Sequence, residues 1–411
     1  MRTIIWLILL FTAAVVAALA LGNNDGLASF YWRGWRFDVS LNLFLLAFVA
    51  ACVVLVVAIN TVDALINLPR RAREWRIAQR DRVAQAALRE ALGEHFGARY
   101  GRAQKAVQKA LAIQSATAEL QVDQDFKALA HLVSASSAHR LQDKRRRDEQ
   151  LQLALAQSRR GALEEGARLL AAEWALEDRD AARALELLAS LGPGVARRTQ
   201  ALRLKLQATR LDKQPLEALR TARLLAKHQG FSKVAAQGLL RALAFEALEG
   251  ARDVDQLRRV WMQLDAADRR DAAVASRAAE CAASLGSPED GRGWLRPFWD
   301  DIAEQSVDAR AELSEALVRV IAGIGPDWLQ RLEHAQQRFP RDKHLVYALG
   351  HALAERQLWG KSRLLLEQVC DDAALGSALR RRCWLTLAQL AEHDDDPERR
   401  ARCFEAAAKL P

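Results

Sequence analysis

Side chains that could bind or react gather on one helical face near the C-terminus. Because they are spaced by 3, 4 and 4 residues, His344, Tyr347, His351 and Glu355 fall on the same side of an α-helix. Imidazole and phenol groups can form hydrogen bonds with a bound ligand, and imidazole can also ligate a metal. Polar side chains on a helix face are also typical of a solvated surface with generic peptide-binding groups, and we favour that interpretation. The face is a candidate binding groove.

A second set of polar side chains occupies equivalent places further along the chain: Arg382, Gln389 and His393. An arginine at such a place can pair with a carboxylate. The sequence has no phosphate-binding loop, no zinc-protease helix and no nucleophile elbow. We therefore predict no catalytic residue, no metal site, no cofactor and no enzymatic activity.

The cysteines give no sign of a disulfide framework or a zinc site. They are five, an odd number, and are widely spaced: Cys52, Cys281, Cys370, Cys383 and Cys403. No CxxC pair occurs. We expect reduced thiols that behave as small hydrophobic side chains in helices.

The composition favours helices almost throughout. Gly (21), Pro (9) and Tyr (3) are scarce in the 411 residues, whereas Ala, Leu, Arg and Glu dominate. These side chains lose little rotamer freedom in a helix. The formal net charge of +9 suggests phosphate, acidic protein or an anionic membrane surface as a partner. No nucleic-acid-binding signature accompanies this charge, so we predict no nucleic-acid partner.

Two apolar segments near the N-terminus predict a membrane anchor. Ile4 to Leu21 and Val39 to Val62 are uncharged, and each can cross a hydrocarbon core, which takes roughly 20 helical residues. The first segment could also be a cleavable signal peptide, because Ala18-Leu19-Ala20 resembles a cleavage site. Its apolar run is longer than a signal core, so we favour a two-helix transmembrane hairpin.

Basic residues predict the direction of this hairpin. Six arginines follow the second segment: Arg70, Arg71, Arg73, Arg76, Arg80 and Arg82. The loop from Gly22 to Asp38 has two Arg and two Asp, together with Tyr31, Trp32 and Trp35, which suit a membrane–water interface. The excess of arginine after the second segment places the C-terminal end of that segment in the cytoplasm. With two membrane helices, the N-terminus then lies in the cytoplasm as well. The arginine cluster could also attract anionic lipid.

The remainder of the chain is predicted to be an α-solenoid. Helices of roughly a dozen residues alternate with short polar breaks, and the stretch from Lys343 superposes on the stretch from Arg381 at an offset of 38. These units resemble the tetratricopeptide repeat, and Leu349-Gly350 fits the point where its two helices cross closely. The stretch from Gly230 to Gly325 matches the tetratricopeptide pattern poorly.

The predicted fold class is therefore all-α, a transmembrane hairpin followed by a tetratricopeptide-like solenoid. We expect three parts: an anchor (residues 1–68), an Arg-rich juxtamembrane helix (residues 69–100) and the repeat domain (residues 101–411).

The order of parts resembles the proteobacterial HemY family across essentially the whole chain. The segment LVYALGHALAERQLWGKSRLLLEQ also reads like the C-terminal repeat of that family. The resemblance implies a multi-pass inner-membrane protein that supports a late stage of haem synthesis, through enzymes of that pathway as partners. Two alternatives stay open: a general envelope assembly or quality-control adapter, and a direct porphyrin or haem carrier. In the carrier, the His and Tyr side chains of the candidate groove would ligate haem iron, and its arginine would pair with a porphyrin propionate.

Overall fold

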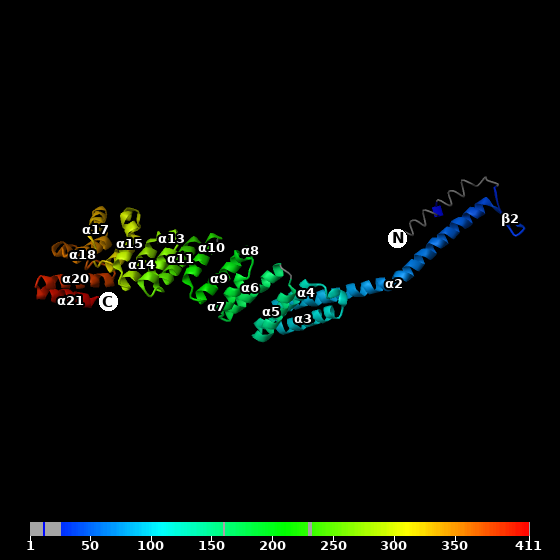
Figure 1. The fold of residues 1–411 in the computed structure, drawn as a ribbon, viewed down its shortest axis with the longest axis horizontal. Coiled ribbons are helices and arrows are strands. Elements are labelled where there is room, and N and C mark those ends of the chain that lie inside the picture. Colours follow the sequence, from blue (N-terminus) through cyan, green and yellow to red (C-terminus); the bar gives the residue numbers. More distant parts are fainter. Residues whose placement is uncertain (1–10, 13–25, 159–160, 229–231, 411) are drawn as a thin grey trace. The chain divides into compact units, whose positions relative to one another are not determined.

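A computed structural model describes residues 11–12, 26–158, 161–228 and 232–410 of the chain (Figure 1). It forms two compact units that part at residues 159 and 160, and each unit is described by itself. The first predicted membrane segment, Ile4 to Leu21, lies almost wholly outside the described residues.

The loop between the two predicted membrane segments contains a β-hairpin, which the sequence analysis missed. Strands β1 (Leu27–Trp32) and β2 (Trp35–Ser40) pair antiparallel, with Phe30 opposite Phe37. The two-residue turn, Arg33-Gly34, has positive φ at both positions, as tight hairpin turns of matching twist require. The predicted all-α class holds for the other described elements, and this hairpin is a local exception because the aromatic residues of the loop have high β propensity.

The hairpin leads directly into one very long helix, α2 (Leu41–Phe96, 56 residues). The side chain of Ser40 caps its first turn by accepting a hydrogen bond from the backbone N–H of Leu43. Pro69 lies inside the helix without ending it. The predicted second membrane segment and the predicted juxtamembrane helix are thus one continuous element, and the expected boundary at residue 68 falls within it.

The last turns of α2 pack as the first helix of a repeat. The other helical elements of unit 1 are α3 (Tyr100–Ser115), η1 (Ala118–Leu120), α4 (Gln124–Arg140) and α5 (Lys144–Gln157). Helices α2 and α3 form one antiparallel pair, and α4 and α5 form the next. Ala87, Leu88 and Ala91 of α2 contribute to a core shared with Val107 and Phe126. The repeats therefore begin inside α2, and not at residue 101 as expected.

Unit 2 contains seven helix pairs among its described residues. The first helices of the pairs are α6 (Ala162–Glu177), α9 (Thr199–Leu211), α11 (Lys233–Glu249), α14 (Ala272–Ser284), α16 (Val307–Arg319), α18 (Lys343–Glu355) and α20 (Ser377–His393). The second helices are α7 (Ala181–Ala189), α10 (Pro215–Lys227), α12 (Val254–Gln263), α15 (Pro288–Asp300), α17 (Pro326–Arg338), α19 (Trp359–Glu367) and α21 (Pro397–Lys409). Short elements join some of them: α8 (Pro193–Ala196), α13 (Ala266–Arg269) and η2 (Ile302–Glu304).

The pairs share a common turn, which shows that they are true structural repeats. In seven pairs the second residue after the first helix has a positive φ between 55° and 78°: Ala98, Gln142, Arg179, Lys213, Gly286, Gln357 and Asp395. A left-handed residue at this place ends a helix and reverses the chain. The same device in both units and in the poorly matching central stretch confirms the predicted solenoid of helix pairs.

The crossing point within a pair is also a shared feature. A Cβ atom on Gly350 of α18 would lie 2.7 Å from Leu366 Cδ2, so the predicted close crossing exists. Ser362 of α19 donates a hydrogen bond to the Gly350 carbonyl over 2.8 Å. In the central pair α14/α15, Ala279 and Gly291 hold the equivalent places, and a Cβ on Gly291 would lie 3.2 Å from Ala279 Cα. The central pair therefore has the same close crossing, but its glycine lies in the second helix of the pair and not in the first.

Candidate functional site

The predicted groove residues divide into a buried pair and five that are half-buried or exposed. Tyr347 is 1% exposed and His351 is 6% exposed, so the prediction that they line an open groove is wrong. Helix α18 packs against α16, α17, α19 and α20, and its residues from Leu345 to Leu353 are all buried. Neighbouring first helices cover the face that looks polar in sequence.

The buried pair forms a small polar contact inside the core. The rings of Tyr347 and His351 meet edge to face, with centroids 4.5 Å apart. His351 Nδ1 lies 3.4 Å from Thr386 Oγ1 on α20, whereas its Nε2 has no hydrogen-bond partner among the described residues. Burial lowers the pKa of His351 to about 3, with the positive charge of Arg382 adding to the effect, and burial raises the pKa of Tyr347. Both side chains are therefore neutral near pH 7.

Two of the predicted groove residues hold the turn between α16 and α17. Glu355 accepts a hydrogen bond from the backbone N–H of Gly323 over 3.0 Å, and Arg382 donates one to the Val318 carbonyl over 3.1 Å. Arg292 of α15 contacts the same turn, because its Nη1 donates hydrogen bonds to the carbonyls of Val320 and Ala322. The sequence analysis missed Arg292, because nothing in the residue pattern marks a buried arginine in a second helix.

The other predicted groove residues lie at or near the surface. Gln389 and His393 are exposed, and the His393 ring is 4.8 Å from that of Trp359. His344 is half-buried, and its Nδ1 lies 3.7 Å from Glu315 Oε1. The structure thus does not bring the seven predicted residues together as one open groove. The described residues contain no group of three or more His, Cys, Asp or Glu that could hold a metal ion.

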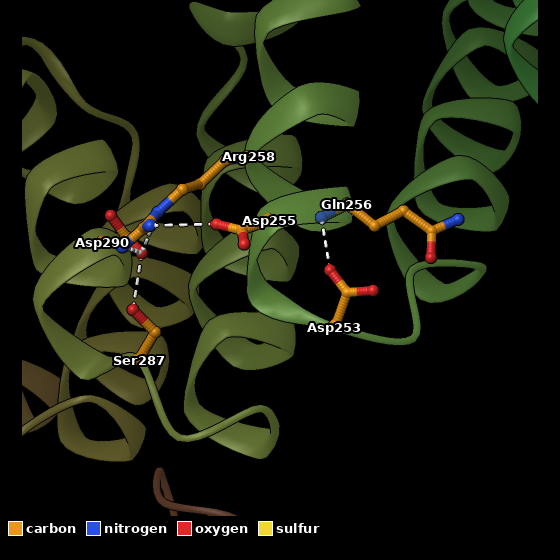
Figure 2. Close-up of polar contacts among 6 residues, drawn as sticks. All are labelled: Asp253, Asp255, Gln256, Arg258, Ser287 and Asp290. Carbon is orange, nitrogen blue, oxygen red and sulfur yellow. Dashed lines mark hydrogen bonds and ion pairs between the residues drawn. The ribbon is translucent and has the colours of Figure 1, made fainter.

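An ion pair links the second helices of two successive helix pairs, α12 and α15. Figure 2 shows Arg258 of α12 between Asp255 on its own helix and Asp290 on α15. The Arg258 Nε to Asp290 Oδ2 distance is 2.8 Å, and Ser287 donates to the same carboxylate. Burial opposes ionisation of Asp290, but the bonds from Arg258 and Ser287 hold its pKa below the usual range. These contacts position repeats, and they do not form a reactive site.

The second candidate surface is the apolar half of α2. Among the described residues, one helix is long and apolar enough to cross a membrane, and it is α2. Its most apolar window has a mean hydropathy of 2.9, and none of that window is buried. Large side chains such as Val54, Leu55 and Ile59 are more than half exposed.

The predicted arginine cluster follows the apolar half on the same helix, and all six members are exposed. Arg70 Nε pairs with Glu74 over 3.0 Å, and Arg80 donates to Thr117 Oγ1 over 3.2 Å. Arg71 and Arg73 have no ion-pair partner among the described residues. These two guanidinium groups are free to meet anions from outside the chain.

The fold and these surfaces define a helical-repeat protein whose first repeat helix continues into an exposed apolar segment. Residues 26–142 match the family model described as the HemY protein N-terminus. Over this region the match confirms the resemblance to the HemY family noted in the sequence.

Comparisons with whole proteins add little to this assignment. No curated protein matches the sequence. Among solved structures, the chain is similar to one of Naa15/Naa10 bound to HypK-THB, with 11% identity, a TM-score of 0.25 and coverage of 84% of this chain and 62% of the other. It is also similar to the TPR domain of P58(IPK), with 11% identity, a TM-score of 0.19 and coverage of 80% and 98%. Such low scores carry no argument about function.

Proposed function

We propose that this protein is an inner-membrane-anchored helical-repeat scaffold that supports a late stage of protohaem biosynthesis by binding other proteins. The observation that carries the proposal is the HemY match over residues 26–142. This region contains helix α2, whose first half is apolar and exposed and whose last turns pack as the first helix of the repeats. A helix shared in this way ties the repeats to the membrane surface, where partners confined to the membrane reach a high effective concentration.

The proposed topology is multi-pass, with both termini in the cytoplasm. The arginines after the apolar half of α2 mark its cytoplasmic end. The β-hairpin of β1 and β2 then lies on the outer side of the membrane, where the exposed rings of Tyr31, Trp32 and Trp35 suit the membrane–water interface. Reporters fused after Arg82 or at Pro411 should be active only in the cytoplasm, and reporters within residues 22–38 only outside. An externally active fusion at Pro411 contradicts this topology.

The arginine cluster is the proposed contact with anionic phospholipids. Arg71 and Arg73 are exposed and unpaired among the described residues, and they follow the apolar segment within a few helical turns. Basic side chains near an anionic membrane surface are attracted to it, and salt weakens the attraction. Replacing both with Gln should weaken the interaction of the juxtamembrane segment with anionic lipid vesicles, while Arg402→Gln, far along the chain, should not.

The scaffold role is tested by purification of the tagged full chain from membranes. We expect enzymes of the haem pathway to be recovered with it. A matched control keeps the repeats and replaces residues 41–62 with an unrelated apolar helix of equal length, because this control separates the anchor from the binding surface. Recovery of envelope assembly proteins without haem-pathway enzymes favours the adapter alternative, and a porphyrin absorption band in the purified protein favours the carrier alternative.

A further inference from the structure

Three cavities in unit 2 differ in how far acidic side chains neutralise the basic side chains that line them. One lies near α10, α11 and α13, and there Arg223 pairs with Asp265 and Asp268 while Arg241 pairs with Asp271 over 2.7 Å. Another lies between α9 and α12, where Arg220 pairs with Glu217 and Arg210 lies 4.0 Å from Glu246. In both cavities most of the basic side chains are neutralised by acidic neighbours. The third cavity is different.

The third cavity, here called the basic pocket, has a volume of about 620 Å³. It lies where the start of α16, the turn between α17 and α18 and the turn before α20 meet. Its lining includes five basic or imidazole side chains and one carboxylate: Arg310, Arg338, Arg341, Lys343, His344 and Asp342. The pocket therefore carries an excess of positive charge.

The single carboxylate is already used inside the protein. Arg310 Nε bonds to Asp342 Oδ2 over 2.8 Å, and both side chains are almost buried, at 10% and 8% exposure. The Arg310 guanidinium also donates to the Gln305 carbonyl and lies 4.1 Å from the centroid of the Phe339 ring. Asp342 caps α18 as well, by accepting from the N–H of His344. Both carboxylate oxygens of Asp342 therefore already accept a hydrogen bond from within the chain.

Two arginines at the rim have no ion-pair partner among the residues that the structure describes. Lys343 pairs with Asp372 over 3.3 Å, whereas Arg338 and Arg341 form no ion pair with any described residue. Both are exposed, and the half-buried ring of Phe339 lies between them in sequence beside exposed Pro340. The pocket thus offers two free guanidinium groups next to a small apolar surface.

We propose that the basic pocket binds an acidic segment of a partner protein, with its carboxylates on Arg338 and Arg341 and an apolar side chain against Phe339 and Pro340. Guanidinium groups bind carboxylates through paired, charge-assisted hydrogen bonds. A peptide fits better than a small metabolite, because small-ligand sites bury most of their ligand and this rim is exposed. The inference rests on the proposed scaffold function and assigns it a contact surface.

The test uses the full chain in zwitterionic nanodiscs, so that lipid charge plays no part. The probe is a short fluorescein-labelled peptide of glutamate and leucine, and the comparison probe has glutamine in place of glutamate. We expect the acidic peptide to bind, with an affinity that falls as salt rises. The Arg338→Glu/Arg341→Glu variant should weaken binding by about tenfold or more.

The matched control is Arg356→Glu/Arg402→Glu, which makes the same charge change at two exposed arginines outside the pocket. This control should change the affinity by less than about twofold. Equal losses in both variants, or equal binding of the glutamine peptide, overturn the proposal. Circular dichroism of each variant, compared with the parent chain, guards against loss of fold.

Purification from membranes separates this inference from the scaffold proposal. If the parent chain recovers haem-pathway enzymes and the Arg338→Glu/Arg341→Glu variant recovers them equally well, the pocket inference fails and the scaffold proposal stands. If the parent chain recovers none of these enzymes while the acidic peptide still binds at the pocket, the scaffold proposal fails and the pocket stands.

Discussion

The apolar half of α2 and helix α18 are built from similar side chains and meet opposite surroundings. The most apolar window of α2 has none of its area buried. In α18, nine consecutive residues from Leu345 to Leu353 are buried by four neighbouring helices. The α2 window is apolar all round, whereas α18 retains His344, Tyr347 and His351 among its apolar residues.

The difference shows what decides where an apolar helix lies. A helix that is apolar on every side and has no neighbour among the described residues must be covered by something outside them, since exposed apolar area of this extent is unfavourable in water, and we propose that lipid covers it here. A repeat helix is covered by the helices before and after it, so even its polar side chains become buried. The following predictions test this contrast, from the largest expected effect to the smallest.

Removal of the apolar half of α2 should have the largest effect. A chain without residues 1–68 should move completely from the membrane fraction to the soluble fraction, because α2 is the described helix that can span a bilayer. A chain without residues 2–25, which retains α2, should remain in the membrane fraction. Fractionation after alkaline extraction measures both, and a membrane-bound chain without residues 1–68 contradicts the comparison.

A bulky side chain at the α18/α19 crossing should destabilise the repeats. A Cβ on Gly350 lies 2.7 Å from Leu366 Cδ2 and 2.9 Å from its Cγ, so Gly350→Leu should lower the free energy of unfolding by about 2–3 kcal/mol. The matched control is Gly293→Leu in α15, because no atom lies within 4 Å of a Cβ there. Denaturant unfolding of both variants checks this, and equal stabilities would show that the crossing is looser than described.

Acid should weaken the core around α18 through His351. Its pKa is lowered from 6.5 to about 3 by burial, so between these values the unfolded chain binds a proton that the folded chain does not. Stability therefore falls as the pH falls below 6.5, and this residue should cost about 1 kcal/mol at pH 5.5 relative to pH 7.5. The variant His351→Gln, which retains hydrogen-bonding capacity toward Thr386, should lack this part of the pH dependence in denaturant unfolding. An unchanged pH dependence contradicts the buried neutral imidazole.

The ion pair between α12 and α15 should have the smallest effect. Arg258 is about half exposed, at 52%, and solvent screens its interaction with Asp290. We expect Arg258→Ala to shift the melting temperature by less than about 2 °C. Arg292→Ala is the contrasting variant, since this arginine is buried and grips two carbonyls of the α16–α17 turn, and it should lower the melting temperature more. A larger effect from Arg258 would reverse this order.

Local pattern was sufficient for the features that depend on neighbouring residues in the chain. The uncharged run that ends at Val62, the arginines after it and the helix-forming composition all follow from side-chain type and spacing. Gly350 could also be predicted, because a close helix crossing leaves no room for a side chain, and the structure has this contact. The HemY match over residues 26–142 agrees with the resemblance noted in the sequence.

Only the tertiary structure decided which polar side chains are reachable. Spacing placed Tyr347 and His351 on one face, but α16 and α20 cover that face, and no sequence pattern reports how closely successive repeats pack. The sequence comparison did not detect the central repeats because their crossing glycine, Gly291, lies in the second helix of its pair, whereas Gly350 lies in the first. A match made position by position cannot detect this change. The basic pocket arises in the same way, because the excess charge of its arginines is evident only once Asp342 is known to pair with Arg310. Side-chain type and spacing determine helices and spans, whereas burial and free charge depend on which helices meet.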